Sequence, residues 1–182
     1  QQRWGEALDD YIEALARAPR RDSVLSSVET HRAKLGVRVH RQLIWPKAFA
    51  RRVKDEIHVT MPKDKSGRAW FAWAICKAVW LGEPEHRKAM TGREEHGPSI
   101  EEERECFANL VGSYMLQVQE GKNERVPQLE RLRRILLSRD LAEFAIYELW
   151  SRFSPNIVLY NGEKQLEKMK AFIRHYVVVK EP

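Results

Sequence analysis

The sequence contains few of the features that would place it in a specialised class of protein. It has 182 residues and only two cysteines, Cys76 and Cys106. Neither has a companion at metal-ligand spacing, so we expect two buried, reduced thiols. No apolar run approaches the roughly 20 residues that a membrane span needs, and no secretory signal is present. These absences favour a cytoplasmic protein that does not span a membrane.

Motifs of known catalytic chemistry are also missing. There is no HExxH sequence, glycine-rich phosphate loop or nucleophile elbow, and the six histidines are not at metal-ligand spacing. One acidic cluster could in principle bind a cation or act as an acid and base: Glu94, Glu95, Glu101, Glu102, Glu103 and Glu105. A solvated loop and helix N-terminus explain this cluster more simply, and we interpret the neighbouring His86 and His96 as surface residues. We therefore predict a protein that is not an enzyme and has no cofactor or metal.

One catalytic possibility stays open. A site assembled from residues that are scattered along the chain would leave no motif in the sequence. A buried polar cluster near the tryptophan-rich segment Trp70 to Trp80 would be its first sign. We expect Trp70, Trp73 and Trp80 themselves to lie in the core, because they recur at helical spacing.

Helical periodicity dominates the apolar residues, which make up 43% of the chain. The expected helices cover residues 4–18, 22–35, 46–57, 70–81, 99–121, 127–136, 140–153 and 163–178. About nine helices with few regular strands indicate an all-α fold. The helix over 70–81 is apolar on most sides, so we expect it to be the central buried element. Residues 157–160 could form a short extended piece.

The first helix carries a recognisable spacing. Ala7, Tyr11, Ala14 and Pro19 follow Trp4 at fixed intervals. This arrangement resembles the second helix of a tetratricopeptide repeat (TPR), a helix pair that stacks into solenoids. The resemblance implies a TPR-like α-solenoid of stacked antiparallel helix pairs. Gln1 stands first instead of Met and the repeat-like helix begins at once, so we expect a part of a longer protein.

The resemblance also implies a division of the chain and a binding face. We predict a TPR-like unit with a basic segment over 1–60, a linker over 61–67, and divergent helical repeats or a helical capping domain over 68–182. The helix over 22–35 would be the first helix of a pair and would line the groove that captures a partner. The register from Pro19 then assigns the contacts to Ser23, Ser27, Thr30 and Lys34.

Positive charge is concentrated in one window. Between Arg32 and Lys54 there are eight Arg or Lys residues and no Asp or Glu, although the whole chain carries only +6. This window predicts an acidic peptide or protein as the partner. The alternative is a nucleic-acid-binding surface in which bases stack on Trp45 and Phe49. That surface would comprise Arg38, Arg41, Lys47, Arg51 and Arg52; otherwise the two aromatic residues belong to the core.

Overall fold

The protein divides into two compact units. A computed structural model describes residues 2–64, 66–97, 99–122, 124–152 and 162–181. The first unit combines both ends of the chain, Gln1–Leu43 and Glu143–Pro182, and the second unit is Ile44–Ala142. The segment 61–67, which was predicted as a linker, lies inside the second unit. Each unit is therefore described by itself.

The described residues are mostly helical, as the periodicity predicts. They form eight α-helices and four short strands. None of these helices is long and apolar enough to cross a membrane. The short extended piece expected at 157–160 lies outside the described residues.

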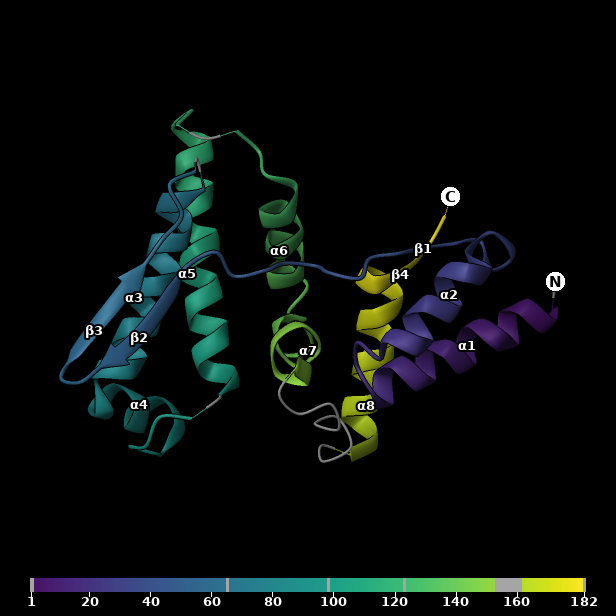
Figure 1. The fold of residues 1–182 in the computed structure, drawn as a ribbon, viewed down its shortest axis with the longest axis horizontal. Coiled ribbons are helices and arrows are strands. Elements are labelled where there is room, and N and C mark those ends of the chain that lie inside the picture. The colour runs from purple at the N-terminus through teal and green to yellow at the C-terminus, as the bar shows by residue number, and fades with distance from the viewer. Residues whose placement is uncertain (1, 65, 98, 123, 153–161, 182) are drawn as a thin grey trace. The chain divides into compact units, whose positions relative to one another are not determined.

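The first unit begins with two packed helices, α1 (Gln2–Arg17) and α2 (Asp22–Leu35) (Figure 1). Leu8, Ile12 and Leu15 recur on one side of α1 and are buried. Gly36 ends α2 as predicted, because its φ of 62° is a left-handed conformation that favours glycine. Its N–H donates to the Arg32 carbonyl. Both helices expected near the N-terminus are thus present.

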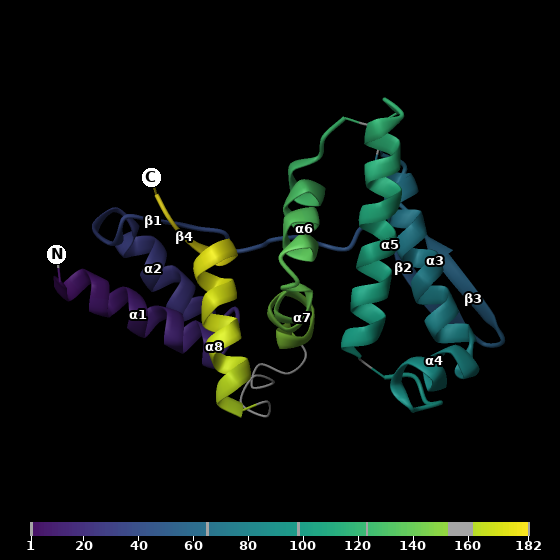
Figure 2. The ribbon, with the colours of Figure 1, turned by 180° about the vertical axis from the view of Figure 1, so that it is seen from behind.

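The C-terminal segment completes this unit. α8 (Gly162–Phe172) continues as a π-helix over Ile173–Val177, and α8 lies beside α1 in both views (Figures 1 and 2). Strand β4 (Val178–Lys180) then pairs antiparallel with β1 (Val37–Val39). The periodicity did not predict either strand. An ion pair between Lys170 and Glu13 joins α8 to α1.

A buried glutamate links three segments of the first unit. α7 (Leu141–Phe144) is followed by a π-helix, Ala145–Leu149, and a 3₁₀ turn, Trp150–Arg152. Glu148, which is fully buried, accepts from the Leu43 N–H at 2.5 Å and from Arg20 Nη1 at 2.6 Å. Because its carboxylate is hydrogen-bonded by a backbone donor and a guanidinium, its burial is compensated.

The second unit is built on α3 (Gly67–Gly82) and α5 (Ile100–Gln119), which pack against one another. Trp70, Trp73 and Trp80 lie in the core, as expected. Cys76 and Cys106 form a disulfide between the two helices, with a Cα–Cα distance of 5.2 Å. The prediction of two reduced thiols was wrong because sequence spacing does not show that two helices bring these residues face to face.

The helix predicted over 46–57 is instead a hairpin. β2 (Phe49–Val53) pairs antiparallel with β3 (Glu56–Thr60), and Lys54 turns the chain with a φ of 57°. Phe49, Val53 and Ile57 fit a helical stripe, but they also fit strands with alternating exposure. Ile57 packs toward Gly82 of α3, whereas Phe49 and Val53 are exposed. Packing against α3 decides between the two patterns.

Two further helices cover the second unit. α4 (Pro84–Thr91) was not predicted, whereas α6 (Pro127–Leu137) begins at its proline as predicted and packs on α5. The helix α3 is not buried on most sides, contrary to expectation. Phe71, Ile75 and Val79 form a stripe on it with 44%, 42% and 39% exposure. The described part of this unit covers only the tryptophan face of α3.

Candidate binding site

The predicted groove residues lie on one stripe of α2, and the hydroxyls of two of them, Ser27 and Thr30, bond back to their own helix. Ser27 Oγ donates to the Ser23 carbonyl and Thr30 Oγ1 to the Ser26 carbonyl, both at 2.9 Å. Lys34 Nζ lies 5.2 Å from the centre of the Trp4 ring on α1. Ser23 and Thr30 are exposed and Ser27 is half-buried. A binding role for these four residues stays a prediction.

The basic window is distributed over both units, and acidic groups already neutralise part of it. In the first unit, Arg41 pairs with Glu29 at 2.7 Å and lies 3.6 Å from Asp22. Its hydrogen bond lowers the pKa of Glu29. Arg38 lies 3.8 Å from Glu181. These two arginines therefore have less charge to offer an acidic partner than the sequence indicates.

The other three basic residues belong to the second unit. Lys47 pairs with Asp64 at 2.7 Å, and this hydrogen bond lowers the pKa of Asp64. Arg52 Nη2 donates to the Leu81 carbonyl at 2.6 Å, near the C-terminal end of α3. Arg51 is exposed on β2 opposite His58. The window therefore does not act as one surface of five equivalent cations.

Two aromatic residues at and before the start of the hairpin are exposed. Trp45 is 46% exposed and Phe49 is 52% exposed, so the core interpretation of these residues was wrong. Phe49 and Arg51 stand two positions apart on β2, so their side chains point to the same face of the hairpin. The structure thus places the Phe49 ring and the Arg51 guanidinium on the same strand, and both side chains are exposed to solvent.

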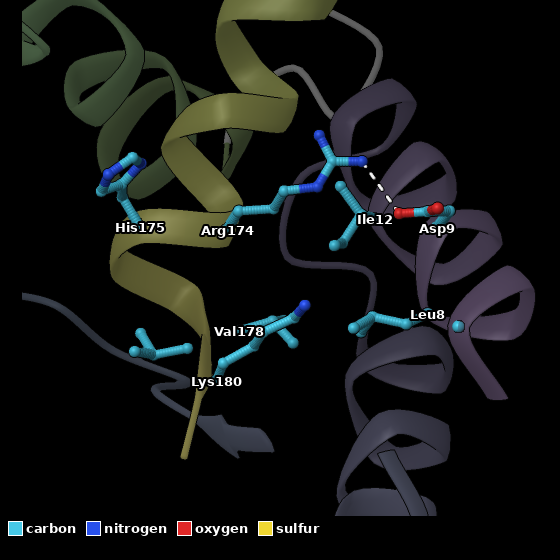
Figure 3. Close-up of a pocket in the computed structure, with 9 residues that line it drawn as sticks. Leu8, Asp9, Ile12, Arg174, His175, Val178 and Lys180 are labelled. Atoms are coloured by element: carbon cyan, nitrogen blue, oxygen red, sulfur yellow. Dashed lines mark hydrogen bonds and ion pairs between the residues drawn. The ribbon is translucent and has the colours of Figure 1, made fainter. Parts of the chain in front are cut away.

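The first unit contains a pocket that the sequence did not indicate (Figure 3). It has a volume of about 420 Å³ and lies between α1 and the C-terminal segment. Its lining residues are Gly5, Leu8, Asp9, Ile12, Arg174, His175, Val178, Val179 and Lys180. Asp9 and Arg174 are 165 positions apart, so no sequence motif could have grouped them.

The floor of this pocket is apolar because both sides supply core residues. Leu8 and Ile12 come from the buried stripe of α1, and Val178 from the start of β4. Their exposed fractions are 8%, 1% and 2%, so they are part of the core and are fixed by packing. These residues give the pocket an apolar floor that the core holds in place.

The rim of the pocket carries more positive than negative charge. Arg174 Nη2 contacts Asp9 Oδ1 at 3.0 Å, and Figure 3 shows Arg174 and Lys180 extending toward α1. His175 points away from α1 in the same view, and its Nδ1 lies 3.3 Å from the Ala171 carbonyl. Arg174 has further N–H donors, and no ion pair is found for Lys180 among the described residues. An acidic group could therefore bind at the rim.

A second polar cluster occurs in the second unit. It corrects the interpretation of the glutamate run as a solvated surface for Glu102 and Glu103, whereas Glu94, Glu95 and Glu101 are exposed as expected. Lys77 Nζ contacts Glu102 at 2.9 Å and Glu103 at 2.6 Å, and all three side chains are at least 87% removed from solvent. Burial raises the pKa of Glu103, while the Lys77 ammonium opposes the shift. The expectation fails because the helix N-terminus packs on α3 and does not face water.

Glu105 and the two histidines beside the run also make polar contacts. Glu105 Oε2 accepts from Trp80 Nε1 at 2.8 Å and lies 3.0 Å from His86 Nε2. His96 lies 3.4 Å from Glu102. The surface interpretation was therefore incomplete for both histidines. This is a buried polar cluster beside the tryptophan helix. A pocket between α3 and α5 that Phe71, Ile75 and Val79 line also reaches Glu105, but Lys77, Glu102 and Glu103 do not line it.

The polar cluster provides no metal site within the described ranges. No group of three or more His, Cys, Asp or Glu side chains in them could hold a metal ion. The Lys77 ammonium already pairs with both buried carboxylates. The pocket of the first unit, by contrast, combines an accessible volume with both apolar and charged lining residues.

In comparisons with known proteins, no protein-family model, curated protein or solved structure matches this chain.

Proposed function

We propose that the chain is a non-catalytic binding module that captures an acidic segment of a partner protein in the pocket between α1 and β4. The observation that carries this proposal is the combination of an apolar floor with the rim cations Arg174 and Lys180. The floor favours burial of an apolar side chain, and the rim favours a neighbouring carboxylate. This is the acidic partner that the charge pattern predicts.

The TPR resemblance becomes part of the same proposal. The packed pair α1 and α2 would be a TPR-like helix pair, and further pairs would stack on it. The proposed contacts differ from those of the resemblance, because the pocket uses α1 and the C-terminal segment instead of the exposed stripe of α2. Ser23 and Thr30 of that stripe would contribute a secondary contact only.

The test is a fluorescence-anisotropy titration with a labelled acidic peptide in which a valine and a glutamate stand two positions apart. Lys180→Glu reverses a rim charge that has no ion pair among the described residues, and we expect it to weaken binding about tenfold. Lys168→Glu, on exposed α8 of the same unit, makes the same change of net charge away from the pocket and is the control. Equal effects of the two variants, or no binding by the wild type, would refute the proposal.

A second candidate function is single-stranded nucleic-acid binding by the hairpin. The observation that favours it is the exposure of Trp45 and Phe49, of which Phe49 stands two positions from Arg51 on β2. Bases stack on exposed aromatic rings while cations contact phosphates. Under this hypothesis, a labelled oligonucleotide binds with a steep salt dependence, and Phe49→Ala and Arg51→Glu each weaken it. The Lys180→Glu variant should leave oligonucleotide affinity unchanged.

A further inference from the structure

We infer that the ligand of the pocket binds as an extended strand that adds to the free edge of β4. This inference rests on the proposed function and specifies the conformation of the acidic segment. β4 pairs with β1 in a two-stranded sheet, and no other described strand pairs with it. One edge of β4 is therefore available for strand addition.

The backbone hydrogen bonds show which groups lie on that edge. His40 N–H donates to the Val177 carbonyl at 2.7 Å, and Glu181 N–H donates to the Gly36 carbonyl at 2.9 Å. In an antiparallel pair the groups of alternate residues point toward the partner strand. The groups of residues 177, 179 and 181 thus point to β1, and those of Val178 and Lys180 point to the opposite edge.

Three of these four backbone groups can bind a ligand. The Val178 N–H donates to the Ile173 carbonyl and closes the preceding helix. The Val178 carbonyl, the Lys180 N–H and the Lys180 carbonyl remain on the edge that faces away from β1. One ligand residue could exchange two hydrogen bonds with Lys180, and a ligand N–H two positions away could donate to Val178.

The pocket lies on this side of the strand. Its lining includes Val178, Val179 and Lys180 but no residue of β1, and it is closed on the far side by α1. Figure 3 shows Val178 and Lys180 on the strand segment, with Leu8 and Ile12 across from them. An added strand would consequently lie between β4 and α1, above the apolar floor.

The charge of the rim and the period of a strand together specify the ligand. Successive side chains of a strand point to opposite sides. Val178 and Lys180 are two residues apart, so their side chains lie on the same side of β4, and the ligand residues paired with them would lie on that side too. The ligand residue paired with Val178 would meet the apolar floor, and the one paired with Lys180, two positions away, would meet the rim cations. The ligand that fits is an extended acidic peptide in which an apolar and an acidic residue stand two positions apart.

N-methylation of the peptide backbone tests the inference separately from the function. Each amide of the labelled valine–glutamate peptide is methylated in turn, which removes one N–H and leaves the charges unchanged. We expect losses of about tenfold at alternate amides and much smaller losses at the intervening ones. The Lys180 amide should also become protected from hydrogen exchange when the peptide binds, whereas the Val179 amide, already directed at β1, should not change.

The outcomes separate the two claims. If the peptide binds and depends on Lys180, but methylation shows no alternation and the Lys180 amide stays unprotected, strand addition is refuted and the proposed function stands. If the peptide does not bind at all, both are refuted. If only a second copy of the chain protects the Lys180 amide, seen as dimerisation in sedimentation, the acidic ligand is refuted.

Discussion

Reduction of the Cys76–Cys106 disulfide should lower the stability of the second unit without changing its core. The disulfide joins α3 to α5, and the sequence separation of the two cysteines is 30. It therefore restricts the unfolded chain more than it adds native contacts. Reduction is a better perturbation than substitution, because it keeps both sulfur atoms in a buried site where Cys76 and Cys106 are only 6% and 0% exposed.

The expected magnitude follows from the length of the closed loop. Loop-closure entropy for this separation corresponds to about 3.6 kcal/mol at room temperature. This is a large fraction of the roughly 5–15 kcal/mol that stabilises a typical domain. The reduced protein should still fold, since the packing of Trp70, Trp73 and Phe107 between the helices does not depend on the disulfide.

The assay is urea unfolding of the oxidised and the reduced protein, followed by tryptophan fluorescence. Trp70, Trp73 and Trp80 all lie in the second unit, so fluorescence reports mainly on that unit. A variant with both cysteines replaced by alanine should not respond to the reductant. A difference below about 1 kcal/mol between the oxidised and reduced proteins would refute the reasoning. Alkylation of two thiols in urea without reductant would also refute it, because a disulfide leaves no thiol to react.

Four further predictions concern single residues. Tyr114→Phe should destabilise the protein by about 1–3 kcal/mol, because the Tyr114 hydroxyl donates to the Glu130 carboxylate and accepts from the Val126 N–H. Tyr147→Phe should be neutral or stabilising, since no described group bonds the buried Tyr147 hydroxyl. Equal losses of stability for the two variants in urea unfolding would contradict this prediction. Burial raises the pKa of Glu103 above 4.5, so its contribution to stability is present below pH 4.5 and is lost as pH rises through the folded-state pKa. Glu103→Gln should then gain stability relative to the wild type as pH rises to neutral, and a constant difference across this range would count against it. Gly112→Ala should stabilise by up to about 1 kcal/mol, because it adds a methyl group in open space within α5. Gly67→Ala should lower the melting temperature, because its Cβ would lie 2.5 Å from a backbone carbonyl oxygen.

The helices that could be predicted from the sequence have local signals at their ends. Ser99 accepts from the Glu102 N–H at 3.0 Å at the start of α5, as the capping pattern predicts. Pro127 starts α6, and Gly36 ends α2. Each of these signals depends only on residues within one turn of the helix end, so it can be recognised from the sequence alone.

Features decided by distant contacts could not be predicted. The hairpin β2–β3 depends on packing against α3, and β1 finds its partner strand 178–180 at the other end of the sequence. The pocket has the same cause, because Asp9 and Arg174 come from helices that meet only in the fold. Charge counting indicated an acidic partner but not the residues involved, since Glu29 and Asp64 neutralise Arg41 and Lys47.

The discontinuous first unit has a consequence for the order of events during synthesis. Ile44–Ala142 is continuous, so the second unit can fold on the ribosome as soon as its last residue has left the exit tunnel. The earlier-made α1, α2 and β1 must wait for α8 and β4, which are translated about a hundred residues later. During that interval the buried stripes of α1 and α2 have no covering partner from α8. A chaperone that protects nascent chains would therefore bind the segment of α1, α2 and β1 for longer than it binds the second unit.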